Sequence, residues 1–244
     1  MLKIVRLIIL RNMERCVYCL SELNKQNRTK DHIFPSSWFP DGTPESIQRW
    51  TVPCCIGCNK YLKMIEEVLF LRWGMGVDPK EPASKGIRER VEKTLSISDT
   101  TNYFVKQIRK RALKKVLRDF VTYKPEQTIK GLAPKEGVRG TTAVQTSNKA
   151  LNKFAEKVIK GLEYKLLNRF VERDRKVQIY YAYAVQPKMD QYFEKWAMLM
   201  IPTLERISLG LGFVAEYAVN KDFPQQVLYK VKIWNHIEFW GLVF

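Results

Sequence analysis

The cysteine-containing part of the chain begins Cys16-Val17-Tyr18-Cys19, continues through Asp31-His32-Ile33-Phe34-Pro35 and reaches Cys55-Ile56-Gly57-Cys58-Asn59. Two Cys-x-x-Cys pairs separated by a few tens of residues have the ligand spacing of a structural, tetrahedral zinc site. We therefore predict that two loops are joined by one zinc ion, with the ligands Cys16, Cys19, Cys55 and Cys58.

A fifth cysteine, Cys54, offers a different pairing with Cys58. A tight knuckle has two residues between its cysteines, so Cys55 is the predicted ligand. The alternative is a set of buried reduced cysteines. In that case the occurrence of two matched Cys-x-x-Cys pairs would be a coincidence. A redox pair is disfavoured because neither Cys-x-x-Cys lies in a βαβ unit. An odd number of cysteines, four of them placed as metal ligands, predicts a cytoplasmic protein rather than a disulfide framework.

The chain of 244 residues is strongly basic, with 42 Lys and Arg against 25 Asp and Glu and a formal charge of +17. This bias indicates an anionic partner, and nucleic acid is the commonest one. A membrane surface is the alternative. However, the apolar run 7–10 is far shorter than the roughly 20 residues that span a bilayer, and we expect no membrane segment. The first ten residues, interrupted by Lys3 and Arg6, are interpreted as packed on the domain rather than as a signal peptide.

The order of apolar residues predicts an α+β fold in two parts. Residues 1–75 hold every cysteine, residues 76–85 resemble a linker rich in Gly and Pro, and residues 86–244 form a basic α+β domain. The predicted helices are 59–72, 103–120, 147–167 and 191–209, the last interrupted at Pro202. Residues 28–35 are predicted as a turn followed by a short strand. The other predicted strands are 176–185, 213–219, 227–234 and 237–244, and the last three favour an antiparallel C-terminal sheet.

Asp31 and His32 are the candidates for chemistry. A neutral imidazole with a reference pKa of about 6.5 can take a proton from water near neutral pH. Successive side chains of a strand point to opposite sides, so these two residues do not form a hydrogen-bonded dyad. Asp31 is better placed to hold a metal ion, of the Mg²⁺ or Mn²⁺ type that prefers oxygen ligands, while His32 activates water. The alternative is a structural histidine.

The combined pattern Cys-x2-Cys, Asp-His-Ile-x-Pro and Val-Pro-x-Cys-x2-Cys-Asn resembles the HNH endonuclease domain, a ββα-metal nuclease fold, in its zinc-stapled form. The resemblance covers roughly residues 12–73. It implies that Asp31 and Asn59 bind one catalytic Mg²⁺ or Mn²⁺ and that His32 is the general base. It also implies products with 5′-phosphate and 3′-hydroxyl ends.

The sequence departs from the family at one position. The family's middle Asn, which orients the catalytic His, usually stands just before the Val-Pro stretch, where this chain has Trp50. Gln48 could substitute if the loop register differs. If neither residue orients His32, we expect backbone contacts alone to hold it and catalysis to be less efficient.

The basic residues suggest where phosphates would bind. Lys63 follows Asn59 on the predicted helix, and a second helix carries Lys149, Lys153, Lys157 and Lys160 opposite its apolar face. Another helix is crowded with Lys and Arg between residues 106 and 118. These runs predict contacts to the phosphate backbone, with solvated surface as the alternative. We expect double-stranded DNA as the partner, with RNA, a protein partner and a homodimer left open.

Taken together, the residues and the resemblance predict a metal-dependent HNH-type DNA endonuclease. By analogy with stand-alone bacterial and phage HNH proteins, it would act in anti-phage defence or in a mobile element. Two alternatives remain open. One is a zinc-stapled nucleic-acid-binding protein whose nuclease site is degenerate. The other is an effector subunit whose nuclease is switched on by a partner.

Overall fold

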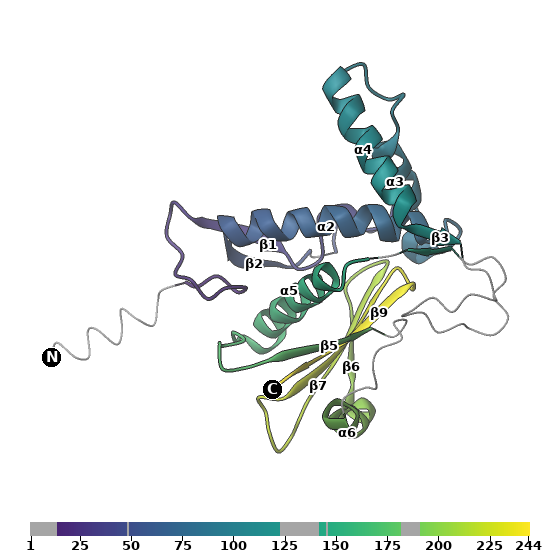
Figure 1. Cartoon of the computed structure of the whole chain (residues 1–244). Coiled ribbons are helices and arrows are strands. Elements are labelled where there is room, and N and C mark those ends of the chain that lie inside the picture. Colours follow the sequence, from purple (N-terminus) through teal and green to yellow (C-terminus); the bar gives the residue numbers. More distant parts are fainter. Residues whose placement is uncertain (1–13, 48, 123–141, 145, 182–190) are drawn as a thin grey trace.

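The structure, a computed structural model, describes residues 14–47, 49–122, 142–144, 146–181 and 191–244. The N-terminal part, up to residue 76, holds a hairpin and a long helix. The C-terminal part holds a twisted sheet with a helix across it (Figure 1). The main elements are β1 (Arg28–His32), β2 (Thr51–Cys55), α2 (Ile56–Gly76), α3 (Ile87–Leu95), α4 (Tyr103–Asp119), β3 (Phe120–Thr122), β4 (Thr142–Val144), α5 (Asn148–Leu167), β5 (Val177–Tyr181), α6 (Gln191–Met200), β6 (Glu205–Ser208), β7 (Phe213–Val219), β8 (Val227–Ile233) and β9 (Ile237–Val243). Short 3-10 helices cover Ser36–Trp38, Pro82–Ser84 and Ile201–Thr203.

β1 and β2 form an antiparallel hairpin in which Asp31 lies opposite Val52 and His32 lies opposite Thr51. The amide of Ile33 donates to the carbonyl of Trp50 at 3.0 Å, so the next pair inward, His32 with Thr51, is a non-hydrogen-bonded pair whose side chains are close together. The alternation also puts Pro53 at a non-hydrogen-bonded position. Its missing N–H therefore leaves no gap in the ladder.

The C-terminal sheet has the strand order β5-β9-β8-β7-β6, and every neighbouring pair is antiparallel. Alternating residues of β8 lie on opposite faces of the sheet and pack against different helices. Tyr229 and Val231 pack with α5 in the main hydrophobic cluster, whereas Leu228 packs with Phe193 and Ala197 of α6 in a second cluster. The two helices therefore cover opposite faces of the sheet.

The main hydrophobic cluster takes residues from both sides of the predicted linker. The indole of Trp38 lies 4.9 Å from the ring of Phe154 and 5.2 Å from that of Trp234, and the Trp234 Nε1–H donates to the carbonyl of Trp38 at 2.8 Å. Val77 and Ala83, inside residues 76–85, are also buried. The predicted boundary therefore does not coincide with a break in the core, and the division into domains stays a prediction.

The α+β class and the antiparallel C-terminal sheet are confirmed, as are helices at α2, α4 and α5. The prediction of a helix through 209 is wrong. α6 ends at Met200, Pro202 lies in a 3-10 turn, and residues 205–208 form the edge strand β6. This strand is mostly exposed and shows no apolar alternation that would reveal it. Of the predicted strand 176–185, residues 182–185 lie outside the described part of the chain.

α3 and α4 stand away from the sheet at one end of α2 (Figure 1). A small cluster of Val91, Leu95 and Val116 packs them together, and a buried ion pair joins Arg72 of α2 to Asp119 at the end of α4. Breaking a buried pair of this kind is costly, so the base of this helical arm is firmly held. No helix in the described ranges is both long and apolar enough to cross a bilayer.

Candidate metal centre and active site

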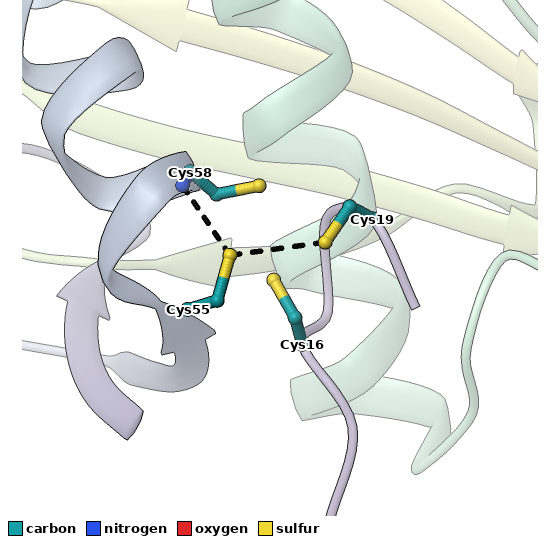
Figure 2. Close-up of side chains that lie close together, drawn as sticks. All are labelled: Cys16, Cys19, Cys55 and Cys58. Atoms are coloured by element: carbon teal, nitrogen blue, oxygen red, sulfur yellow. Dashed lines mark hydrogen bonds between the residues drawn. The ribbon is translucent and has the colours of Figure 1, made fainter. Parts of the chain in front are cut away.

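Four sulfur atoms converge between the first knuckle and the start of α2 (Figure 2). The Sγ atoms of Cys16, Cys19, Cys55 and Cys58 all lie within 4.8 Å of one another. The Sγ atoms of Cys19 and Cys55 are 3.8 Å apart, close to the separation of about 3.8 Å that Zn–S bonds of about 2.3 Å give in a tetrahedron. The geometry fits a structural metal such as zinc, and the cluster contains Cys55, the predicted ligand, and not Cys54.

Local backbone hydrogen bonds shape both knuckles. In the first, the amide of Leu20 donates to the carbonyl of Cys16 at 2.9 Å and closes a tight turn. In the second, Cys55 caps α2, and its sulfur accepts from the amide of Cys58 at 3.3 Å. The amide of Val17 donates to the carbonyl of Pro53 at 3.0 Å, so the first knuckle is attached along β2. These hydrogen bonds hold the two knuckle segments together beside the sulfur cluster independently of a metal ion.

Electrostatics around the sulfurs favour a cation. A hydrogen bond with the Cys54 thiol lowers the pKa of Cys16 to about 4, whereas burial and the neighbouring Cys16 sulfur raise the pKa of Cys58. Thiols this close cannot all ionise unless a positive ion compensates them, which a divalent metal does. Cys54 itself is fully buried on β2 outside the cluster, where its sulfur also lies 3.2 Å from the carbonyl of Cys55.

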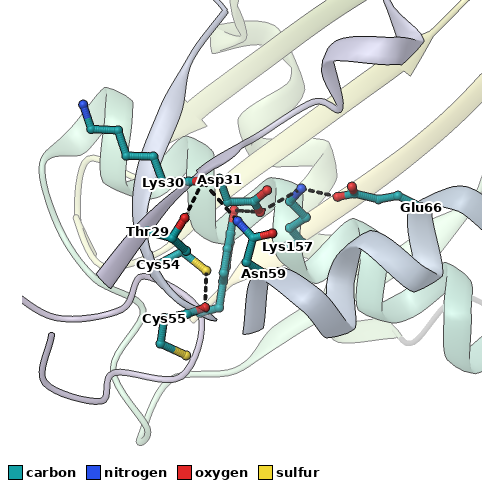
Figure 3. A network of polar contacts seen from close by, with 9 residues as sticks. Thr29, Lys30, Asp31, Cys54, Cys55, Asn59, Glu66 and Lys157 are labelled. Atoms are coloured by element: carbon teal, nitrogen blue, oxygen red, sulfur yellow. Dashed lines mark hydrogen bonds and ion pairs between the residues drawn. The ribbon is translucent and has the colours of Figure 1, made fainter. Parts of the chain in front are cut away.

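Asp31 points to the inner side of the hairpin, and its carboxylate is held by two donors. The Tyr18 hydroxyl donates to Oδ2 at 2.9 Å. The Lys157 ammonium lies 2.9 Å from the same oxygen, as Figure 3 shows. Burial and the Asp31 charge raise the pKa of Tyr18, so the phenol keeps its proton and remains a donor. Both contacts are made to Oδ2. By holding this atom they also fix the position of Oδ1, the other oxygen of the carboxylate.

The Lys157 ammonium also forms an ion pair with Glu66 of α2, so it lies between two carboxylates (Figure 3). The side chains are almost completely buried: Lys157 is 1% exposed, Glu66 10% and Asp31 12%. Burial raises the pKa of Glu66 to about 7, against the opposing effect of Lys157. Tyr18, Glu66 and Lys157 therefore surround Asp31, which the sequence had predicted as a metal ligand.

The prediction that Lys157 lies on an exposed lysine face is wrong. Residues spaced by four advance about 40° around an α-helix at each step, because a turn takes 3.6 residues. Along Lys149, Lys153 and Lys157 this drift carries the third lysine to the edge of the apolar face. Lys149 and Lys153 are exposed, whereas Lys160 is half-buried between Glu156, at 2.8 Å, and the carbonyl of Tyr18, at 3.1 Å.

His32 lies on the opposite side of the hairpin from Asp31, as predicted from the strand alternation. Its Nδ1 atom is buried and has no hydrogen-bond partner within the described residues. The family's orienting Asn is thus not replaced by Trp50 or Thr51, and Gln48 lies outside the described residues. Burial lowers the pKa of His32, opposed by Asp31 and assisted by Lys157 and Arg49. The imidazole is therefore predominantly neutral at neutral pH.

Asn59 lies in the first turns of α2 and is tied to β1. Its Nδ2 donates to the carbonyl of Lys30 at 3.1 Å, which places the amide next to the residue that precedes Asp31. The amide oxygen remains as the donor atom for a metal. A carboxylate oxygen of Asp31 and an amide oxygen of Asn59 are both hard ligands, so their chemistry fits Mg²⁺ or Mn²⁺. Lys63, farther along the same helix, is exposed.

Comparison of the chain with protein-family models, with curated proteins and with solved structures finds no match.

Proposed function

We propose that this protein is a metal-dependent endonuclease of the HNH type that hydrolyses phosphodiester bonds in DNA. The proposal rests above all on the arrangement of β1, β2 and α2. An antiparallel hairpin followed by a helix, with four clustered cysteines, carries Asp31 and His32 at the end of β1, and Asn59 of α2 donates to the carbonyl of Lys30 beside them. Zinc is the proposed structural metal, and Mg²⁺ or Mn²⁺ is the proposed catalytic one.

Each residue has a distinct part in this proposal. Asp31 and Asn59 would hold the catalytic metal, which supplies Lewis-acid stabilisation of charge on the phosphate oxygens when bound. Neutral His32 would take the proton of the attacking water. Tyr18 and Lys157 hold the Asp31 carboxylate through Oδ2. The Nδ1 of His32 has no partner among the described residues, which suggests a base that is oriented loosely, and hence modest catalysis.

The proposed surface for the duplex includes one face of α4. Its exposed basic residues, here called the α4 basic face, are Lys110, Arg111, Lys114, Lys115 and Arg118. Arg109 is excluded because it donates to the carbonyl of Ser96 at 2.6 Å within the arm. Exposed Lys149, Lys153 and Lys63 are the remaining proposed phosphate contacts. Each phosphate contact that is lost should reduce the salt dependence of binding by about 0.9 in the log–log slope.

The triple variant Lys110→Ala/Lys114→Ala/Arg118→Ala tests this surface. Duplex affinity and its salt slope should both fall, measured by fluorescence anisotropy at several salt concentrations. The control, Lys195→Ala/Lys221→Ala, removes two exposed charges, one from α6 and one from the turn between β7 and β8, and should change neither. Equal affinities for the triple variant and the wild type would remove α4 from the proposal.

The decisive experiment incubates purified, zinc-loaded protein with supercoiled plasmid in Mg²⁺ or Mn²⁺. Nicking or linearisation that requires the added metal and is lost in His32→Ala supports the nuclease and its base. A parallel competition between labelled DNA and RNA duplexes identifies the nucleic acid. Persistent cleavage by His32→Ala protein would show that another group, or a contaminant, is responsible.

Two observations favour a second candidate function. The Nδ1 of His32 has no partner among the described residues, and the Lys157 ammonium lies against the Asp31 carboxylate, where it would oppose a metal ion. In this candidate the protein is a zinc-stapled nucleic-acid-binding protein, or a nuclease that a partner must activate. Cleavage by the isolated wild-type chain but not by His32→Ala protein argues against both. Binding without cleavage argues for them.

We also propose a cytoplasmic location. Within the described residues all five cysteines are free thiols, which a reducing compartment preserves for metal binding.

A further inference from the structure

Lys157 joins the hairpin to a part of the chain that lies far away in sequence. α5 begins more than a hundred residues after β1, yet its lysine reaches Asp31 at 2.9 Å and also pairs with Glu66. No other basic residue of the described chain is buried with its charge between two carboxylates. Burying a lysine charge is costly unless acidic partners compensate it, so the buried position of Lys157 depends on its two carboxylate partners.

The charges at this point have a direct consequence for metal binding. Two buried carboxylates attract a cation, and the cation in place is an ammonium fixed to α5. A divalent ion on the Asp31 carboxylate would therefore meet a positive charge a few ångströms away, in a site of low polarity where charges interact strongly. Mg²⁺ is commonly held by only one or two carboxylates together with substrate phosphates, which suits a site weakened in this way.

Building on the proposed function, we propose that the Lys157 ammonium is a built-in cation that keeps the affinity of the Asp31 site for divalent metal low in the free protein. Metal is then recruited together with the phosphate of the nucleic acid, whose negative charge offsets the ammonium. Lys157 is a positioning residue, because it acts through Asp31 and is too deeply buried to touch substrate. Since the coupling of two ligands is reciprocal, metal should strengthen nucleic-acid binding by the same factor.

The first test measures Mn²⁺ binding without nucleic acid, by the electron paramagnetic resonance signal of free Mn²⁺, on full-length zinc-loaded protein. Lys157→Met keeps the unbranched stem and removes the charge, so its affinity for Mn²⁺ should exceed that of the wild type by about tenfold or more. The gain should disappear in Asp31→Asn/Lys157→Met. Lys157→Arg, which keeps the charge, should bind as weakly as the wild type.

Lys165→Met is the matched control. Lys165 lies about two turns later on α5 and is exposed, so its removal should leave Mn²⁺ affinity unchanged. The inference is overturned if Lys157→Met binds Mn²⁺ no more tightly than the wild type. It is also overturned if the tighter binding survives Asp31→Asn, because the ion would then occupy a different site.

Lys157→Met removes one member of a buried ion network, and circular dichroism checks that it folds. If it does not fold, His32→Ala protein, which retains Lys157, is titrated with Mn²⁺ with and without duplex DNA. The duplex should tighten Mn²⁺ binding by about tenfold or more, and this gain should vanish in Asp31→Asn/His32→Ala. Equal Mn²⁺ affinity with and without duplex overturns the inference.

The two proposals fail in different ways. If Lys157→Met gains Mn²⁺ affinity at Asp31 while no protein cleaves nucleic acid, the nuclease proposal fails and the role of Lys157 stands. If the wild type cleaves DNA with Mg²⁺ while Lys157→Met gains no affinity, the role of Lys157 fails and the nuclease stands.

Discussion

Gly161 of α5 lies so close to Ile33 that a β-carbon at position 161 would stand 2.8 Å from Cγ1 of Ile33. Ile33 directly follows His32 and is fully buried. The missing side chain therefore lets α5 approach the hairpin closely. Lys157 lies about one turn earlier on the same helix, so this approach also sets how far the ammonium reaches toward Asp31.

Gly161→Ala should lower the free energy of unfolding, and the direction of this change tests the close approach of α5 to Ile33. In an open helix the same change would stabilise the protein by up to about 1 kcal/mol, because Ala is the better helix former. Here overpacking against Ile33 should cost about 1–3 kcal/mol and prevail. Urea denaturation measures the difference, and Lys165→Ala, at an exposed position of α5, is the control. A more stable Gly161→Ala protein would contradict the close approach.

The two adjacent cysteines of β2 should behave differently. Cys55→Ser should lose most of the bound zinc and lower the melting temperature, because a structural zinc ion contributes roughly 10 kcal/mol or more to folding in small modules. Cys54→Ser should keep one zinc per chain, since its sulfur lies outside the cluster. Elemental analysis and differential scanning calorimetry measure both effects. Metal-replete wild-type protein without zinc would overturn the assignment.

The pH profile of DNA cleavage should reflect the environment of His32. Burial lowers its pKa from the usual 6.5, so the neutral, base-competent form persists to lower pH. The rate should therefore rise with pH through a midpoint below 6.5 and level off above it. Single-turnover cleavage between pH 5 and 8 tests this, with a second substrate length to exclude pH effects on binding. A midpoint above 6.5 would show that a different group limits the reaction.

Thr51→Asn should accelerate cleavage. Thr51 faces His32 across a non-hydrogen-bonded pair, so an amide there could supply a partner for Nδ1. We expect a gain of about tenfold, a small part of the 10²–10⁴-fold that a well-oriented general base supplies. Thr51→Val is the control, similar in shape but without the amide. Equal rates for the two variants would show that orientation of His32 does not limit catalysis.

The parts predicted correctly from the sequence depend on local spacing. The clustering of the four cysteines and the opposite directions of Asp31 and His32 follow from knuckle length and strand alternation, and α5 follows from its apolar face. The role of Lys157 could not be found in this way. Its contact with Glu66 spans 91 residues of sequence and depends on how closely α5 approaches the hairpin segment, where Gly161 lies against Ile33. Lys157 was therefore predicted, with its neighbours in the lysine run, as a contact to phosphate.

The aromatic contacts of Trp38 have a consequence for recombination between related genes. Its indole, from the hairpin segment, is enclosed by Phe154 of α5 and by Trp234 after β8, and its carbonyl accepts the Trp234 Nε1–H. Exchanging residues 1–75 for another hairpin-and-helix unit would leave these rings facing an empty space. Recombination between relatives should therefore rarely separate the two halves, and substitutions on either side of this contact should co-vary.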